Sequence, residues 1–266
     1  MKHNFEVREI NKYVALDMVQ KYHYSNTLPK LNKYFLGFYE NNDLKGVITL
    51  GWGTRPKHTI KKLFPSLDTQ DYLEIGRMCM TEEMERNSES QMISACVKWL
   101  KRNVPTVKVL FTWADGMLGK PGYVYQASNF MYVGFNQTDI YLKDGIKIHP
   151  RQTRALFKRD EKDTRLSIRP TVEQQIYYGI EHYRGNQYKY LYFLCGKYAK
   201  RYLLKHCEFK IQKPPKKDSL RWQKYNTLTK KWQECDMPPY VSDFDKGSKI
   251  LQSLVEKFMS RDTLCV

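Results

Sequence analysis

Residues 87–134 read NSESQMISACVKWLKRNVPTVKVLFTWADGMLGKPGYVYQASNFMYVG, and this stretch decides the fold. Ser88 and Gln91 have the spacing of a capping box, in which two side chains satisfy free N–H groups at a helix start. Apolar residues then recur at helical spacing as far as Leu100. Pro105 cannot continue a helix. The first third of the stretch therefore predicts an amphipathic helix.

The stretch continues with a predicted strand that ends in a polar group. Val107–Trp113 is β-rich and mostly apolar, as expected of a strand covered on both faces. Asp115 follows at the carboxyl end, where ligand sites of α/β sheets gather. A glycine loop, Gly116–Gly122, leads into a short helix at Tyr123–Asn129 and a further strand. Helix, buried strand, loop, helix and strand together predict an α/β fold.

The flanking segments alternate in the same way. Before residue 87 the sequence predicts a strand at Phe5–Ile10, a helix from Asn11 to about Tyr22, paired strands at Tyr34–Tyr39 and Lys45–Trp52, a short helix and loop within 56–71, and a strand at Tyr72–Met80. After residue 134 it predicts a hairpin of Ile140–Leu142 and Ile146–Ile148 across Asp144-Gly145, a charged surface loop at 159–170, a helix at Thr171–His182, a strand at Tyr188–Phe193, a boundary at Pro214–Lys217, and one helix, Lys249–Met259, in the tail.

Length and composition limit the class of protein. The chain has 266 residues, enough for a sizeable core and one or two domains. No apolar run is long enough to span a bilayer, and MKHNFEVREI lacks the apolar segment of a secretory signal. The six cysteines show no C-x-x-C spacing, which argues against a structural zinc site. We expect a cytoplasmic protein with reduced cysteines and no membrane partner.

The charge is strongly positive and unevenly distributed. Lys and Arg total 45 against 28 Asp and Glu, a net charge of +17. Residues 1–140 hold 18 basic and 14 acidic groups, whereas residues 141–266 hold 27 basic and 14 acidic groups. Aromatic residues interleave with the basic ones, which favours a nucleic-acid partner over a surface that is charged only for solubility. The sequence predicts a nearly neutral catalytic half and a polyanion-binding half.

Five short motifs occur in an order that is more specific than any one of them. They are His23-Tyr24-Ser25 with Pro29, Glu74-x-x-Arg77, the N-x-E-S and WAD segments of the opening stretch, and YQASNF at 125–130. A basic, aromatic segment at 188–216 follows. Over roughly residues 20–217 the chain resembles the Mom family of phage DNA-modification proteins, whose core is similar to the GNAT acyltransferase fold.

The resemblance implies a fold and an activity. It implies a GNAT-like catalytic domain at 1–157, a mixed α/β sheet flanked by helices, followed by a basic, aromatic-rich C-terminal extension at 158–266. It implies a phage transferase that adds a methylcarbamoyl-type group to adenine N6 in double-stranded DNA, in the cytoplasm of the host cell. Such a modification shields phage DNA from host restriction endonucleases.

Adenine N6 is a poor nucleophile because its lone pair is delocalised into the ring. A transferase acting there needs a proton acceptor and stabilisation of developing charge. The resemblance implies catalytic roles for His23, Tyr24, Ser90 and Asp115, and an iron requirement. Imidazole, phenolate and carboxylate suit iron, so His23, Tyr24 and Asp115 are the candidate metal ligands. Each taken singly also fits a cap, a strand terminus or a satisfied histidine.

The donor is less defined than the acceptor. A GNAT fold usually places a glycine-rich loop after the strand that ends near Met80, and its N–H groups hold the pyrophosphate of an acyl-CoA donor. Residues 81–89 read TEEMERNSE, with four glutamates and no glycine. Like charge beside a pyrophosphate is unfavourable, which favours a non-standard donor. Asn87, Ser88 and Ser90 are the candidate cofactor-binding residues.

The predicted DNA contacts are of two kinds. Gln126 and Asn129 match the N6/N7 edge of adenine, or alternatively fix the local backbone. The family's glycine loop often carries a histidine where this chain has Lys120-Pro121, so Lys120 contacts phosphate or is an ordinary solvated lysine. The basic candidates for phosphate contact are Arg151, Arg154, Lys200, Arg201 and Lys205.

Two other functions fit the same pattern. One is a GNAT-like N-acyltransferase acting on RNA, protein or a small amine, and the other is a DNA-binding protein with an inactive core. The retained His23, Tyr24, Ser90 and Asp115 argue against an inactive core. Donor, exact product, DNA context, the role of residues 218–266 and oligomeric state are left open by the sequence.

Overall fold

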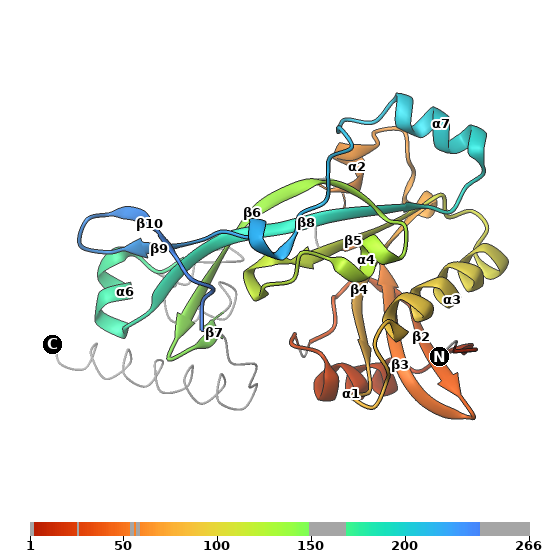
Figure 1. Cartoon of the computed structure of the whole chain (residues 1–266), viewed down its shortest axis with the longest axis horizontal. Coiled ribbons are helices and arrows are strands. Elements are labelled where there is room, and N and C mark those ends of the chain that lie inside the picture. Colours follow the sequence, from red (N-terminus) through yellow and green to blue (C-terminus); the bar gives the residue numbers. More distant parts are fainter. Residues whose placement is uncertain (1–2, 26, 54–55, 57–58, 149–168, 240–266) are drawn as a thin grey trace, which may run out of the picture. The chain divides into compact units, whose positions relative to one another are not determined.

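A computed structural model describes residues 3–25, 27–53, 56, 59–148 and 169–239 (Figure 1). Within it the chain forms two compact units that interleave in sequence. Unit 1 holds residues 1–114, 120–136 and 188–216, and unit 2 holds residues 115–119, 137–187 and 217–266. Two long strands, β6 (Met131–Lys143) and β8 (Glu181–Phe193), contribute residues to both units.

Unit 1 is built on a mixed sheet. Its strands follow the order β1-β2-β3-β4-β5, then the unit-1 parts of β8 and β6. Their bounds are β1 Glu6–Glu9, β2 Asn32–Glu40, β3 Asp43–Gly51, β4 Tyr72–Met80 and β5 Val109–Asp115. The first four strands pair antiparallel, whereas β4 and β5 are parallel. The tight β2–β3 turn places Asn41 and Asn42 at positive φ, a conformation that asparagine tolerates better than most residues.

Helices cover both faces of this sheet. Val47 of β3 packs with Met18 and Val19 of α1 (Lys12–Tyr22), whereas its neighbour Gly46 lies against Met92 of α3 (Ser88–Asn103). Because successive strand residues face opposite sides, α1 and α3 lie on opposite faces. The face of α1 also carries α2 (Ile60–Leu63) and α7 (Lys197–Lys205), which pack with β5 and β8 through Leu63 and Leu203. The core of unit 1 therefore has two layers.

Unit 2 has its own smaller core. Met117, Ile140, Leu142 and Tyr183 pack together with Trp222 and Cys235. Its elements are 3-10 helix η3 (Gly116–Leu118), β7 (Ile146–Ile148), α6 (Val172–Tyr178), β9 (Trp222–Asn226) and β10 (Lys231–Cys235). β7 pairs with β6, and β9 pairs with both β8 and β10.

Most elements expected from the sequence are confirmed. The α/β class with a mixed, helix-flanked sheet is present, and β4 occupies the predicted Tyr72–Met80. Asn11 caps α1 by accepting a hydrogen bond from Tyr13 N, and Asp144 and Gly145 form the predicted turn at positive φ. β5 begins two residues later than expected but ends at Asp115.

Three expectations were wrong. The helix predicted to reach His182 ends at Tyr178, because Gly179 adopts the left-handed conformation that stops a helix. The region 218–239, in which no strand was expected, forms the β9–β10 hairpin. Ser88 and Gln91 form no capping box: the N-cap is Asn87, and both side chains bond elsewhere.

Several expectations fall outside the described residues. They are the boundary at 157/158, the charged loop at 159–168, the arginines Arg151 and Arg154, and the helix Lys249–Met259. Of the cysteines, Cys79, Cys96, Cys195, Cys207 and Cys235 are free thiols. No helix in the part of the chain that the structure describes is long and apolar enough to cross a membrane.

Candidate active site

The central irregularity of unit 1 is the parting of β4 and β5. The two parallel strands pair from Tyr72↔Val109 to Ile75↔Thr112, and both continue beyond that point. On its other side, β4 has a bulge opposite Thr49/Leu50 of β3, with Gly76 as the extra residue. A bulge bends a strand and redirects the side chains that follow it. The parting therefore opens next to Glu74 and Arg77.

Glu74 is a carboxylic acid inside an otherwise apolar strand segment. Burial raises the pKa of Glu74 to about 7, although a hydrogen bond from Trp113 and the charge of Arg77 act in the opposite direction. Gly53 closes over it: a Cβ atom at Gly53, whose φ is +70°, would lie 2.1 Å from Glu74 Oε2. A carboxyl group that titrates near neutral pH suits general acid–base chemistry.

Arg77 fixes the segment that contains the HYS motif. Its guanidinium donates from Nε to the Thr27 carbonyl at 2.8 Å and from Nη2 to Ser25 Oγ at 2.9 Å. A third bond joins Nη1 to its own strand at the Gly76 carbonyl, 2.7 Å away. The strand motif Glu74-x-x-Arg77 thus serves two purposes. It provides a half-buried carboxyl group, and it anchors Ser25 and Thr27.

His23 and Tyr24 form a stacked pair with ring centroids 4.3 Å apart. Nδ1 of His23 lies 2.9 Å from the Ser25 amide nitrogen and 3.0 Å from the Ser25 carbonyl, so the backbone engages this atom in either tautomer. Burial lowers the pKa of His23 to about 3, helped by the charges of Arg77 and Lys120, so the ring is neutral near pH 7. Lys120 Nζ lies 4.3 Å from the centroid of the Tyr24 ring.

The YQASNF segment supports the other side of the parting. Tyr125 of α4 (Tyr123–Ala127) is buried, which raises the pKa of its hydroxyl, and it bonds with Thr112 of β5. The amide nitrogen of Gln126 donates to Tyr190 Oη at 3.0 Å and to the Pro215 carbonyl at 3.1 Å. Gln126 therefore fixes the local backbone. This is the structural role that was considered for it beside a contact with the edge of adenine. Asn129 is exposed, with φ at 61°.

Asp115 ends β5, as the sequence predicted, and belongs to unit 2. Its Oδ1 accepts a hydrogen bond from Met117 N at 3.1 Å, so the carboxylate caps the 3-10 helix that follows. Its side chain is half-buried. The residues that share unit 1 are His23, Tyr24, Glu74, Arg77, Trp113 and Lys120.

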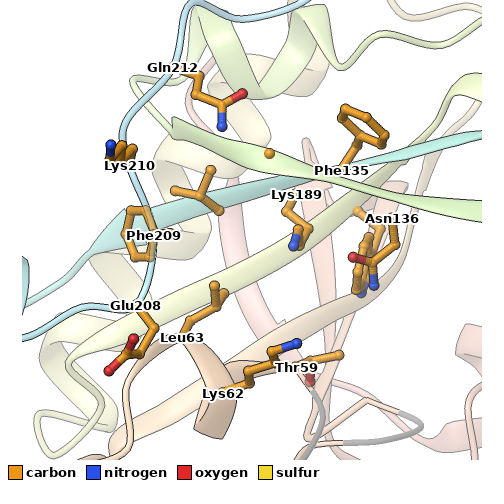
Figure 2. A pocket seen from close by; sticks show the side chains of 13 residues that line it. Thr59, Lys62, Leu63, Phe135, Asn136, Lys189, Glu208, Phe209, Lys210 and Gln212 are labelled. Carbon is orange, nitrogen blue, oxygen red and sulfur yellow. The ribbon is translucent and has the colours of Figure 1, made fainter.

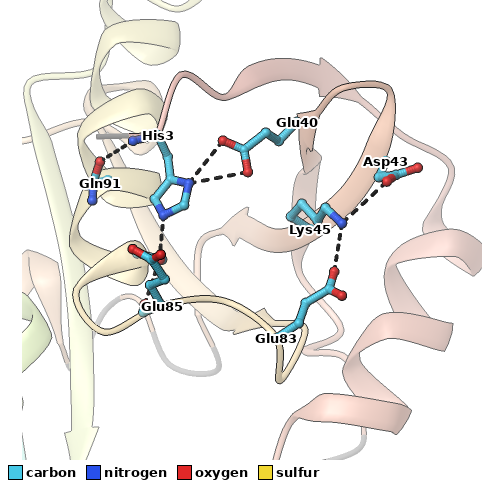
Figure 3. Close-up of polar contacts among 8 residues, drawn as sticks. His3, Glu40, Asp43, Lys45, Glu83, Glu85 and Gln91 are labelled. Carbon is cyan, nitrogen blue, oxygen red and sulfur yellow. Dashed lines mark hydrogen bonds and ion pairs between the residues drawn. The ribbon is translucent and has the colours of Figure 1, made fainter. Parts of the chain in front are cut away.

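The predicted cofactor-binding residues lie at the start of α3, next to the polar contacts of His3 with Glu40 and Gln91 (Figure 3). Ser88 is fully buried; its hydroxyl donates to the Glu85 carbonyl at 2.6 Å and lies 3.0 Å from His3 Nε2. His3 Nδ1 lies 3.0 Å from Glu40 Oε1, and its amide donates to Gln91 Oε1 at 2.7 Å. Ser88 is thus engaged inside the fold.

Ser90 and Asn87 are more accessible than Ser88. Ser90 Oγ donates to the Asn87 carbonyl at 2.8 Å, and Asn87 adopts a left-handed conformation without a side-chain cap bond. The acidic loop before them is partly paired, because Lys45 Nζ lies 2.7 Å from Glu83 and 3.4 Å from Asp43. A donor phosphate at this helix start would meet the backbone N–H groups and Ser90.

The donor set does not fit iron. Among the described residues no three His, Cys, Asp or Glu side chains come together in a group that could hold a metal ion. Nδ1 of His23 is engaged by the backbone, and two cationic side chains, Arg77 and Lys120, already depress protonation of this ring. A metal cation would add a further positive charge there. Iron therefore remains a prediction of the sequence.

Three of the described basic residues predicted to contact DNA, Lys200, Arg201 and Lys205, lie on α7, whereas Lys120 precedes α4. Arg201 and Lys205 are exposed, and Lys200 Nζ lies 5.4 Å from the centroid of the Phe193 ring. On the same helix Tyr198 is 85% and Tyr202 58% exposed, while Leu203 is buried in the core. The sequence signalled the charge of this helix but not its exposed tyrosines.

Two features of the site escaped sequence reasoning. Glu74 was seen only as part of a strand motif, although an acidic residue among the apolar residues of YLEIGRMCM was the available signal. Trp113 was seen only as a strand residue, and its hydrogen bond to Glu74 joins segments 39 positions apart. Nothing in the local pattern signals that pairing.

Comparison with known proteins gives one consistent family. The profile of the Mom protein family matches residues 4–216. Methylcarbamoylase Mom of Escherichia phage Mu is 31% identical over 210 residues, which are 79% of this chain and 83% of that protein.

Solved structures resemble the chain more distantly. A Bacillus subtilis acetyltransferase in complex with CoA has a TM-score of 0.38 and 12% identity, covering 72% of this chain and 99% of its own. A GNAT family acetyltransferase from Elizabethkingia anophelis with acetyl-CoA bound has a TM-score of 0.38 and 11% identity, with the same coverage.

Proposed function

Because this chain belongs to the Mom protein family, we propose that it is a transferase that modifies adenine in DNA. The group transferred is of the methylcarbamoyl type, in keeping with the name of its relative from phage Mu, and the acceptor atom is N6. The modification protects phage DNA from host restriction enzymes. The observation that carries the chemistry is Glu74, a half-buried carboxyl group whose pKa burial raises to about 7.

In this proposal Glu74 acts as general base. A bond forms between N6 and the transferred carbon, the bond from that carbon to the donor's leaving group breaks, and the leaving group departs with the electron pair. N6 gives up one proton in the process, and the Glu74 carboxylate receives it. A base with a pKa near the working pH is effective because a large fraction is ionised and still basic. Trp113 and Arg77 hold its carboxylate form in place.

His23, Tyr24 and Lys120 provide polar and cationic groups around the same region. The neutral ring of His23 is held by Ser25, and Lys120 stands over Tyr24, which places positive charge near the region where the transferred group develops negative charge. We propose catalytic contributions from His23, Tyr24, Ser90 and Asp115, as the family resemblance implies. Asp115 follows Trp113 by two residues at the end of β5.

An acyl-CoA-type donor is proposed with its anionic end at the start of α3. The N-terminus of a helix offers unpaired N–H groups and a favourable dipole for phosphate. Ser90 and the backbone at Asn87 are the more accessible groups there, since Ser88 is buried. Glu83 and its acidic neighbours oppose a highly charged donor there, which is the physical reason to test donors other than acetyl-CoA.

Double-stranded DNA is the proposed partner, with α7 as one contact surface. Lys200, Arg201 and Lys205 would neutralise phosphates, and the exposed Tyr198 and Tyr202 would pack against sugars or bases. Arg151 and Arg154 are proposed as further phosphate contacts.

Nucleoside mass spectrometry tests the function directly. DNA from cells that express this chain should contain a new adenosine adduct, and DNA from cells expressing Glu74→Gln should lack it. Unmodified DNA from wild-type cells, together with acylated RNA, protein or small amines, would instead establish the N-acyltransferase alternative. No product of any kind would point to a DNA-binding protein with an inactive core.

A further inference from the structure

A hollow of about 410 Å³ lies on the face of unit 1 that carries α2 (Figure 2). Pockets of a few hundred Å³ are the usual size for small organic ligands. α2, the end of β5, β6, β8 and the segment after α7 all contribute to its walls. The residues that give the pocket its chemistry are Lys62, Lys189, Lys210, Trp113, Phe135 and Asn136.

The polar part of the pocket is positively charged. Figure 2 shows the ammonium groups of Lys62 and Lys189 pointing into the hollow from different elements. Burial, and then the nearby charge of Lys62, lowers the pKa of Lys189. Lys210 is a third cation, and Glu208 is the one carboxylate among the described lining residues. Two like charges held at the wall of a hollow are stabilised when an anion binds between them.

The apolar part of the pocket is aromatic. Phe135 lines the pocket and is 52% exposed, and its ring centroid lies 6.5 Å from that of Tyr188. Trp113 and Phe209 line the pocket as well, and each packs against another aromatic ring. The ring centroids of Trp113 and Phe111 are 5.2 Å apart, and those of Phe209 and Phe64 are 5.4 Å apart. Rigid aromatic surfaces of this kind stack nucleobases.

Amide groups complete the set. Asn136 and Gln212 lie on the lining, and carboxamides match the donor and acceptor pattern of an adenine edge. Cations, aromatic rings and amides in one hollow correspond to the phosphate, the flat face and the edge of a purine nucleotide. A simple acyl group or an amino acid would use only part of this chemistry.

The pocket also adjoins the proposed base. Trp113 lines the hollow and donates a hydrogen bond to the carboxyl group of Glu74. Trp113 is therefore shared between this pocket and Glu74, which is not itself a lining residue. Enzymes that react with a base in duplex DNA must first turn it out of the stack into such a pocket.

We propose that this pocket binds one purine nucleotide, with its base against Phe135 and Trp113 and its phosphate between Lys62 and Lys189. The inference rests on the proposed function in naming the source: the nucleotide is the adenine of the DNA strand to be modified, turned out of the duplex. The adenine nucleotide of a CoA-type donor has the same chemistry, so the experiment must separate the two sources.

The test uses the full-length protein and fluorescence anisotropy with two labelled oligonucleotides. One is an oligothymidylate with a single central adenine, and the other carries an abasic analogue at that position. Wild type should bind the adenine form about tenfold more tightly, as stacking of one base allows. Phe135→Ala should abolish this difference, and Lys62→Met with Lys189→Met should weaken both probes.

Matched controls are available in the same unit. Tyr13 on α1 is 74% exposed and Lys101 on α3 is exposed, so Tyr13→Ala and Lys101→Met remove comparable groups away from the pocket. Both should keep the tenfold difference. Unchanged thermal melting of the Phe135→Ala protein would establish that the loss is local.

The source of the nucleotide is decided with CoA. If Phe135→Ala weakens CoA binding and leaves the adenine-to-abasic difference intact, the pocket serves the donor and the DNA assignment is overturned. If neither ligand responds to the pocket variants, the pocket proposal itself fails. If the variants behave as expected but wild-type cells contain no modified adenine, the proposed function fails and the nucleotide pocket stands.

Discussion

Two polar regions of unit 1 differ in how their charges are compensated. At the start of α3, His3 meets the Glu40 carboxylate at 3.0 Å and the Ser88 hydroxyl at 3.0 Å. Around the parting of β4 and β5, burial penalises the charged form of Glu74, and it does the same for Lys189 in the adjoining pocket. Polar groups whose hydrogen bonds are satisfied stabilise a fold. Ionisable groups whose charged form is disfavoured by burial are typical of sites that act on a ligand.

This comparison predicts opposite outcomes for mutations in the two regions. Changes at the His3 region should lower stability and spare the chemistry. Changes at Glu74 should abolish the chemistry and leave the fold equally stable or more stable. The predictions below run from the largest expected effect to the smallest.

Replacing Glu74 with glutamine should give the largest loss of activity. Removal of a general base typically lowers kcat by about 10²–10⁴-fold. DNA binding should be unchanged, since the amide keeps the shape of the side chain. Glu6→Gln is the matched control, because Glu6 is exposed and pairs with Arg8. Single-turnover rates with modified-nucleoside detection measure the effect, and a Glu74→Gln enzyme with normal turnover would remove Glu74 from the mechanism.

The same variant should be more stable than wild type above neutral pH. In the folded protein the pKa of Glu74 is raised to about 7 from a usual value of 4.5, so folding favours the protonated form. That contribution to stability is complete below pH 4.5 and is lost as pH rises through 7. Glu74→Gln removes the dependence, and its advantage should grow to at most about 3 kcal/mol by pH 8. Urea unfolding of both proteins at pH 5 and pH 8 checks the sign; an advantage that is larger at the lower pH would contradict it.

His3→Ala should destabilise the fold without changing turnover. The substitution removes the contacts of the imidazole with Glu40 and Ser88, and it relaxes the backbone that bonds to Gln91. A hydrogen bond to a charged group contributes about 1.5–3 kcal/mol to stability. We expect a loss of about 2 kcal/mol in the free energy of unfolding. His206→Ala, at the exposed end of α7, should stay within about 0.5 kcal/mol. A loss of kcat in His3→Ala at a temperature where it is fully folded would break the comparison.

A structural feature of these regions is predictable from the sequence when the residues that produce it are close together in the chain. Asn11 and the Asp144-Gly145 turn were predicted because each acts within a few residues. The capping box failed because Asn87 is the N-cap and because His3, which is far away in the sequence, contacts both Ser88 and Gln91. The burial of Glu74 depends on Gly53 and Trp113, which only the folded sheet brings together. The β9–β10 hairpin was missed because its short strands are half-exposed and carry little apolar alternation.

Gly53→Ala should disturb the site by displacing Glu74. A Cβ atom would lie 2.1 Å from Glu74 Oε2, and φ at +70° disfavours any residue with a Cβ. We expect a loss of more than about 1 kcal/mol in stability together with reduced activity. Gly196→Ala is the control, because nothing lies within 4 Å of its Cβ position. Equal behaviour of the two variants in thermal melting would argue against close packing at Gly53.

The smallest effects of single substitutions are expected for DNA binding by α7, because each cation there is at least partly exposed to solvent and would contribute only one phosphate contact. Removal of residues beyond 157 is unsuited to this question, because it deletes β8, which lies between β5 and β6 in the strand order. Point changes avoid that problem. Lys200→Ala, Arg201→Ala and Lys205→Ala should each weaken duplex DNA binding modestly and almost equally for different sequences, and each should flatten the log–log salt dependence by about one unit. Lys101→Ala on α3 should leave the slope unchanged.

Unlike Glu74→Gln, the α7 variants should regain full turnover at saturating DNA, because they affect binding and not proton transfer. Slopes identical to wild type in all three would mean that the charge of this helix serves solubility.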